Sequence, residues 1–193
     1  MSQGKRYPLP FNPRRLDRRA VDIVKRLQWD GHEAYLVGGC VRDHVLGLRP
    51  KDYDIATSAT PGQVRRLFRR SRIIGRRFKI VHVYAGREIY EVATFRKEPP
   101  RGKDEKAVPI LDDNAFGTAK EDGLRRDFTV NGLFLDPVKK EIVDFVGGME
   151  DLEARRLISI GPPDLRFRED PVRVLRLIKF MRRLDLQPGS KEL

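Results

Sequence analysis

Two glycines and two aspartates stand close together in the first third of the chain. Gly38 and Gly39 follow the apolar segment 34–37, and a helical pattern begins directly after them. Glycines at such a junction let the backbone approach a phosphate closely, and free N–H groups at the helix start attract it. Asp52 and Asp54 follow in a predicted strand, where alternate residues share one face. Two adjacent carboxylates repel each other unless a cation lies between them, and hard oxygen ligands favour Mg²⁺.

Each of these two pieces has an ordinary interpretation when it is taken alone. Paired glycines also form plain turns, and Asp-Tyr-Asp is compatible with a polar edge strand. The order strand, Gly-Gly, helix, strand, Asp-x-Asp is what favours a nucleotide site with a metal. Glu91, in the predicted strand 88–95, can lie beside the aspartates and is a candidate third ligand of a two-metal site. The alternative for Glu91 is an exposed strand glutamate.

A second polar group spans residues 125–132, with the sequence RRDFTVNG. Arg125 and Arg126 can hold a triphosphate through paired, charge-assisted hydrogen bonds. Asp127 and Asn131 can fix a ribose or orient the two arginines. The alternative for the whole segment is a salt-bridged helix start.

A third group lies in the predicted amphipathic helix 170–184. Asp170, Arg173 and Arg176 follow one another at intervals of three residues and form a polar stripe that can face the edge of a base. The apolar residues on the opposite side are Val174, Leu177, Ile178 and Met181. The alternative is a set of solvated helix pairs, each worth about 0.3–0.5 kcal/mol.

The charge of the chain points to a polyanionic partner. Lysine and arginine number 40 against 28 aspartates and glutamates, for a net charge of +12. Such an excess attracts nucleic acid first and an anionic membrane surface second; a merely solvated basic surface is the remaining interpretation. Arginines are densest between residues 65 and 77. The candidate RNA-binding residues in and beside this segment are Arg69, Arg70, Arg76, Arg77 and Lys79.

Composition excludes several other classes of protein. No apolar run approaches the roughly 20 residues that a membrane span needs, and the basic N-terminus lacks the apolar core of a secretory signal. One cysteine excludes an internal disulfide and suits a reducing cytoplasm. We therefore expect a cytoplasmic protein without membrane contact.

Helical and strand periods alternate along the chain and predict an α/β or α+β fold with a mixed sheet. Residues 1–13 are predicted to be a flexible arm, and residues 96–118 a mobile loop. The predicted helices include 14–28, 40–48, one opened by Thr60-Pro61, one near Met149, and 170–184. The predicted strands are 34–37, 52–57, 72–74, 79–84, 88–95, 133–135 and 142–145. Nothing after the last helix can cover its apolar stripe, which suggests a longer protein cut short.

Together these motifs resemble the bacterial branch of the tRNA nucleotidyltransferase/poly(A) polymerase family. The resemblance runs from about residue 35 to 180 and rests on LVGGCVRD with KDYDIAT, RRDFTVNG, DFVGGMEDL and REDPVRVLR. It implies a nucleotidyltransferase head over 14–148, with a five-stranded mixed sheet flanked by helices. The start of a helical neck would follow over 149–193.

The resemblance also implies roles for particular residues. Asp52 and Asp54 would bind metal, and Asp127 would act at the catalytic site. The implied nucleotide contacts are Gly39, Arg42, Asp170, Arg173 and Arg176. Lys179 stands where the family often has arginine, so that contact is not carried over, because lysine lacks the planar fork. Gly132 stands where alanine is usual.

Two activities occur in the family that these motifs resemble: addition of AMP from ATP to RNA 3′ ends, and addition of CCA to tRNA. The segments RIIGRRFKIVHV (72–83) and DDNAFGTAKEDGLRRDF (112–128) resemble the poly(A) polymerase branch more closely. We therefore expect a template-independent poly(A) polymerase that is a monomer and uses two Mg²⁺ ions and ATP. CCA addition is the alternative, and a non-catalytic RNA-binding module is disfavoured because Asp52 and Asp54 are both present.

Overall fold

The computed structural model describes residues 4–76, 78–98 and 115–189. In this part of the chain, eight strands form one mixed sheet and two short strands pair separately. The strands are β1 (Lys5–Pro8), β2 (Ala34–Val37), β3 (Asp54–Thr57), β4 (Ser71–Ile74), β5 (Ile80–Ala85), β6 (Glu88–Thr94), β7 (Leu133–Asp136), β8 (Glu141–Asp144), β9 (Arg156–Leu157) and β10 (Gln187–Pro188). The helices are α1 (Arg18–Trp29), α2 (Gly39–Val45), α3 (Pro61–Leu67), α4 (Ala119–Leu124), α5 (Gly148–Glu153), α6 (Pro163–Glu169) and α7 (Val172–Leu184), with 3₁₀ turns η1 (Pro13–Arg15) and η2 (Thr129–Asn131).

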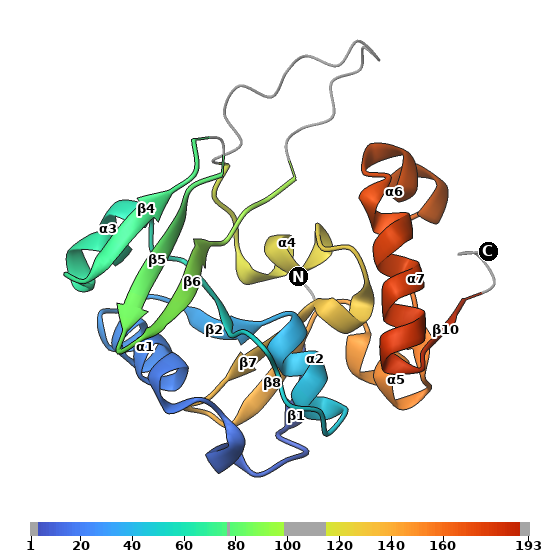
Figure 1. Ribbon diagram of the computed structural model, residues 1–193, viewed down its shortest axis with the longest axis horizontal. Helices are drawn as coiled ribbons and strands as arrows, with labels where there is room; N and C mark the ends of the chain where they lie inside the picture. Colours follow the sequence, from blue (N-terminus) through green and yellow to red (C-terminus); the bar gives the residue numbers. More distant parts are fainter. Residues whose placement is uncertain (1–3, 77, 99–114, 190–193) are drawn as a thin grey trace.

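The strand order in the large sheet is β1-β8-β7-β2-β3-β6-β5-β4. Neighbouring strands are antiparallel except β3 and β6, which run parallel and are joined by a long connection that contains α3, β4 and β5. A parallel pair requires such a crossover, whereas hairpins suffice elsewhere. Figure 1 shows α3 beside β4 and β5, with α6 and α7 far from them on the other side of the molecule.

One face of the sheet is covered by α1, α2 and α3. Helix α1 begins at Asp17, whose carboxylate accepts from the Ala20 N–H at 2.9 Å. Its apolar positions recur at helical spacing, and Ala20, Ile23, Val24 and Leu27 are buried. Thr60 and Gln63 cap α3 reciprocally. These helices enclose the larger core with Val81, Val83 and Val92 from the strands.

The opposite face has a second, smaller core of aromatic side chains. Phe95 and Phe134 are fully buried there, with Ala119 of α4, Val37 and Ala56 packed around them. Asp54 shares this face, because residues two apart on a strand point the same way and Ala56 lies in the core. The catalytic candidates therefore lie on the face that α4 partly covers.

The predicted α/β class with a mixed sheet is confirmed, but the expected sheet of five strands is too small. All seven strands that the sequence pattern predicts join one sheet, and β1 adds an eighth. The arm predicted for residues 1–13 is wrong for Lys5–Pro8, which pairs with β8 in antiparallel register. Its backbone groups complete an otherwise unpaired edge.

The starts of two predicted elements also differ from the structure. Strand β3 begins at Asp54, so Asp52 precedes it. The last helix begins at Val172, because Asp170 ends the short helix α6, which the sequence pattern did not indicate. Most of the loop predicted for 96–118 lies outside the described residues. Across the described ranges, no helix is both long and apolar enough to cross a bilayer.

Candidate active site

The glycine pair forms a turn that a larger residue would strain. Gly38 has φ +69° and ψ −128°, a conformation that residues with a Cβ rarely adopt. A Cβ at this position would lie 3.1 Å from Nη1 of Arg126. The Gly38 N–H donates to the Leu133 carbonyl of β7, which fixes the turn against the sheet. The turn thus starts α2 and leaves room for the arginine beside it.

Asp52 and Asp54 face the same cleft, although only Asp54 belongs to a strand. Asp54 is paired in parallel register with Glu91 of β6, so the two carboxylates lie next to each other. The pKa of the Asp54 carboxyl is raised, first because surrounding protein displaces water and then because Glu91 is close. Arg126 opposes this shift and Asp52 adds to it. A cation at this place would remove the repulsion between the carboxylates, so the donor set fits Mg²⁺.

Glu91 does not line the cleft itself, and its carboxylate lies 3.6 Å from His82 Nε2. Within the described ranges, no three His, Cys, Asp or Glu side chains are grouped closely enough to form a metal site. Asp52 and Asp54 are therefore the better-placed candidates for metal ligands, and Glu91 lies beside Asp54 but outside the cleft.

Arg42 is held rigidly in the cleft by three neighbours, Asp43, Asn131 and Phe180. Its guanidinium donates to Asp43 Oδ1 from Nε (2.8 Å) and Nη2 (2.6 Å), and to Asn131 Oδ1 from Nη1 (2.6 Å). It also lies 4.9 Å from the ring centroid of Phe180. Arg42 and Asp43 are both buried, and Asp43 additionally pairs with Arg183 of α7 at 3.2 Å. Asn131 thus orients this arginine.

Asp127 joins the η2 turn to helix α7. Its Oδ1 accepts from the Phe128 N–H (2.8 Å) and from Asn131 Nδ2 (3.0 Å), which fixes the η2 turn. Its Oδ2 accepts from Arg176 Nε at 2.7 Å. The Arg176 guanidinium also lies 5.5 Å from the ring centroid of Phe180. Asp127 therefore lines the cleft as an anchor for both the turn and α7.

Arg125 and Arg126 are neighbours in sequence but have different places. Both pair with Asp122 of α4 at 2.9 Å. Burial raises the pKa of the Asp122 carboxyl, but Arg126 and Arg125 outweigh that effect and the net pKa is lowered. Arg126 lines the cleft and stacks over Phe134 at 5.2 Å, whereas Arg125 does not line it. Of these two arginines, Arg126 alone lies in the cleft, and its contact with a triphosphate stays a prediction.

Asp170 and Arg173 line the cleft from α6 and α7 without bonding each other's side chains. Asp170 Oδ1 accepts from the Val172 N–H at 3.1 Å and so starts α7. Arg173 Nη1 donates to the Arg166 carbonyl at 3.0 Å and lies 3.4 Å from Glu169. Both partners of Arg173 belong to α6, so this arginine ties α7 to α6.

The cleft has a volume of about 590 Å³, enough for a nucleotide-sized ligand. The predicted residues that it brings together are Gly38, Gly39, Arg42, Asp52, Asp54, Arg126, Asp127, Asn131, Asp170, Arg173 and Arg176. The predicted RNA-binding residues lie elsewhere. Arg69 and Arg70 border a separate hollow next to β4, and Arg76 and Lys79 are exposed in the β4–β5 turn. Arg77 lies outside the described residues.

Six lining residues were not among the predicted site residues: Cys40, Asp43, Lys51, Lys179, Phe180 and Arg183. A local signal existed for some of them. Arg183 is seven residues after Arg176, and Phe180 is four after it, so all three share one face of α7. Asp43 directly follows Arg42 in the motif already singled out. Lys51 offered no comparable signal.

A mixed sheet with helices on both faces, and a glycine turn facing two aspartates across a cleft, define a nucleotidyltransferase head. Residues 34–158 match the family described as the poly(A) polymerase head domain. The chain is 46% identical to poly(A) polymerase I of Haemophilus influenzae, over 91% of this chain and 40% of that protein. It is 40% identical to the CCA-adding enzyme of Bacillus pumilus, over 89% of this chain and 42% of that one.

Among solved structures, the CCA-adding enzyme of Bacillus stearothermophilus in complex with CTP has a TM-score of 0.77 and 34% identity. That match covers 90% of this chain and 40% of the solved one. The chain thus belongs to the poly(A) polymerase head domain family. It spans about 40% of the length of the relatives it matches.

Proposed function

We propose that this chain is the catalytic head of a template-independent RNA nucleotidyltransferase that transfers AMP from ATP to RNA 3′ ends. The observation that carries the proposal is the shared cleft in which Asp52 and Asp54 face Arg126 and the Gly38 turn. In the reaction, the RNA 3′-hydroxyl oxygen bonds to the α-phosphorus of ATP. The bond between the α-phosphorus and the oxygen that bridges to the β-phosphate breaks. Pyrophosphate leaves with that oxygen, and the hydroxyl proton passes to solvent.

Different side chains of the cleft would bind the metal ions and the triphosphate. Asp52 and Asp54 would hold two Mg²⁺ ions, with Glu91 supporting Asp54 from the next strand. When bound, these ions lower the pKa of the attacking hydroxyl and neutralise charge on the leaving pyrophosphate. Arg126 and Lys179 are placed to attract the triphosphate, and the rigid Arg42 gives it a fixed hydrogen-bonding partner.

The preference for ATP rests on sequence likeness. Relatives named poly(A) polymerase I are 45–46% identical to this chain, against 38–40% for those named CCA-adding enzyme. CCA addition to tRNA is the second candidate, favoured by the fold match to a CCA-adding enzyme with CTP. Both proposals place the protein with RNA in the cytoplasm, as the single cysteine suggests.

The test uses the protein at its full natural length with Mg²⁺ and each labelled nucleoside triphosphate in turn. An oligo(A) primer and a tRNA lacking CCA serve as acceptors. Long tails made with ATP alone on oligo(A) are the expected result. Extension that stops after CCA on the tRNA would instead establish the second candidate, and no incorporation under any condition would overturn both.

A further inference from the structure

A row of polar side chains crosses the outer half of the sheet, starting at Asp54. Glu91 is paired in register with Asp54 on one side and with His82 of β5 on the other. His82 in turn is paired with Arg72 of the edge strand β4. Residues directly opposite each other on neighbouring strands share a face. The face that carries the reacting carboxylates therefore continues to Arg72.

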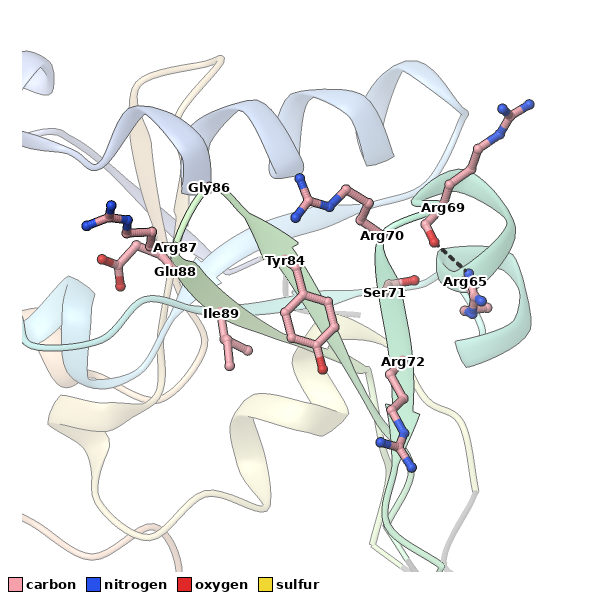
Figure 2. Close-up of a pocket in the computed structure, with 10 residues that line it drawn as sticks. All are labelled: Arg65, Arg69, Arg70, Ser71, Arg72, Tyr84, Gly86, Arg87, Glu88 and Ile89. Atoms are coloured by element: carbon pink, nitrogen blue, oxygen red, sulfur yellow. Dashed lines mark hydrogen bonds between the residues drawn. The ribbon is translucent and has the colours of Figure 1, made fainter.

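A hollow of about 620 Å³ lies at this edge, beside the β5–β6 turn (Figure 2). Tyr84 and Ile89 are opposite each other in the same two strands, two residues along from His82 and Glu91, and so share their face. Figure 2 shows the Tyr84 ring between Ile89 and the strand that carries Arg72. Ile89 is 54% exposed and Tyr84 is half-buried, so a flat apolar surface is available.

The rim of this hollow is strongly basic. Five arginines and one glutamate line it: Arg65, Arg69, Arg70, Arg72, Arg87 and Glu88. Within the described residues, no carboxylate lies within ion-pair distance of the guanidinium groups of Arg70, Arg72 or Arg87. These three groups keep their hydrogen-bonding capacity for a ligand, and guanidinium groups suit phosphate oxygens.

A second hollow of about 550 Å³ shares lining residues both with the arginine-lined hollow and with the cleft that contains Asp52 and Asp54. It shares Glu88 and Ile89 with the arginine-lined hollow, and it shares Lys51 and Asp52 with the nucleotide cleft. Its other basic lining residues are Arg15, Arg19 and Arg49. The three hollows therefore adjoin one another in order, from the cleft to the edge of the sheet.

We propose that these hollows form one groove along which the 3′ segment of single-stranded RNA reaches Asp54. This rests on the proposed function. The terminal nucleotide would lie at Asp52 and Asp54, with the preceding backbone beside Lys51 and Arg49. An upstream base would stack on Tyr84 while Arg72 and Arg87 contact its phosphates. Aromatic stacking and backbone contacts of this kind bind RNA without reading its sequence, as a tailing enzyme requires.

The dimensions suit a short RNA segment. Three inter-strand steps of about 4.8 Å separate β3 from β4, a distance of about 14 Å. At a stacked rise of about 3.4 Å, this corresponds to about four nucleotides. An acidic protein or an anionic membrane would also satisfy the arginines. Neither would account for the aromatic ring on the groove floor or for the continuity with the carboxylates.

The experiment compares primers shorter and longer than the groove in the full-length protein. Primers of about two and about ten nucleotides are extended with ATP by the wild type and by the variants Tyr84→Ala, Tyr84→Phe and Arg72→Ala. Lys139→Ala is the charge-matched control, because Lys139 is exposed in the β7–β8 turn and lines none of the three hollows. Equilibrium binding of the long primer is measured alongside by fluorescence anisotropy.

We expect Tyr84→Ala and Arg72→Ala to raise KM for the long primer about tenfold, with little change for the short primer or for ATP. Tyr84→Phe should behave as wild type because the ring is retained. Equal effects on both primers, or an equal loss in Lys139→Ala, would overturn the groove. Binding that depends on Tyr84 in a protein that extends no primer would uphold the groove and reject the proposed function. Wild type that neither binds nor extends RNA would reject both.

Discussion

At the scale of single residues, Asp54 is the position on which the proposed chemistry depends. It is the first residue of β3 and lines the cleft. It also lies next to Glu91, because β3 and β6 pair in parallel with these two residues in register. The pKa of its carboxyl is raised first by burial and then by the neighbouring negative charge of Glu91. A cation bound beside Asp54 would oppose both effects, because it favours the charged form of the carboxylate.

Asp54→Ala, and likewise Asp52→Ala, should abolish nucleotide addition while leaving the fold intact. Metal ions contribute several kcal/mol to charge stabilisation, so loss of a ligand should lower kcat at least about a hundred-fold. Activity is measured with ATP and an RNA primer, and folding by circular dichroism and Tm. Asp22→Asn, on the exposed side of α1, is the control and should keep full activity. A well-folded Asp54→Ala protein with near-normal turnover would refute the metal-binding role.

Gly38→Ala should destabilise the protein and disturb the cleft together. The positive φ and the 3.1 Å approach to Arg126 both oppose a methyl group, at a cost of about 1–3 kcal/mol. Thermal unfolding of the variant measures this, with Gly62→Ala as the matched control. Gly62 lies inside α3 with no atom within 4 Å of a Cβ, so alanine should be neutral or stabilising there. An unchanged Tm for Gly38→Ala would show that the turn relaxes freely.

At the scale of elements, the helix α7 has two distinct relations to the head. Arg176 and Arg183 bind carboxylates of the head, Asp127 and Asp43 respectively. Within the described residues, the side chain of Arg173 on the same helix bonds only to groups of α6, the Arg166 carbonyl and Glu169. Arg176 and Arg183 thus anchor α7, whereas Arg173 is the arginine of this helix that we expect to face the ligand.

This separation predicts different outcomes for two alanine variants of the full-length protein. Arg173→Ala should change the ratio of kcat/KM for ATP over CTP by the cost of one base contact, about 1–3 kcal/mol. Arg176→Ala should lower Tm and reduce activity with both nucleotides alike, because it removes a tie between neck and head. Steady-state kinetics with each nucleotide and thermal unfolding distinguish them. An unchanged ratio in Arg173→Ala together with a lower Tm would make that arginine structural.

At the scale of the whole molecule, positive charge is distributed to favour a polyanion near the carboxylates. The net charge is +12, and the two hollows that adjoin the cleft are together lined by eight arginines and one lysine. Such a field concentrates RNA near the reacting groups and accelerates encounter.

The apolar side chains Leu175 and Ile178 are also exposed on α7, and this chain spans about 40% of the length of its relatives.

Binding of single-stranded RNA to this chain should weaken steeply with salt. For about four phosphate contacts, with a slope of about −0.7 for each, affinity should fall about 50-fold between about 50 and 200 mM salt. Fluorescence anisotropy with a labelled oligonucleotide at several salt concentrations measures the slope. A flat response over this range would show that the basic excess is not an RNA-binding surface.

Local sequence determined much of the element structure because its rules operate over a few residues. The Thr60-Pro61 start of α3, the apolar spacing of α1 and the strand at 34–37 all follow from neighbours three or four positions apart or fewer. The motif residues themselves were also identifiable, since Gly-Gly before a helix and Asp-x-Asp have chemical meaning wherever they occur.

Only the tertiary structure decided which of these residues meet. Asp54 and Glu91 adjoin because β3 and β6 pair in parallel, and Asp43 and Arg183 meet across 140 positions of sequence. Arg126 enters the cleft while its neighbour Arg125 does not, a difference that no local pattern contains. The groove between the cleft and Tyr84 likewise depends on strand order and register. Pairing across such separations is set by the packing of the entire sheet, which a periodicity of two or 3.6 residues does not encode.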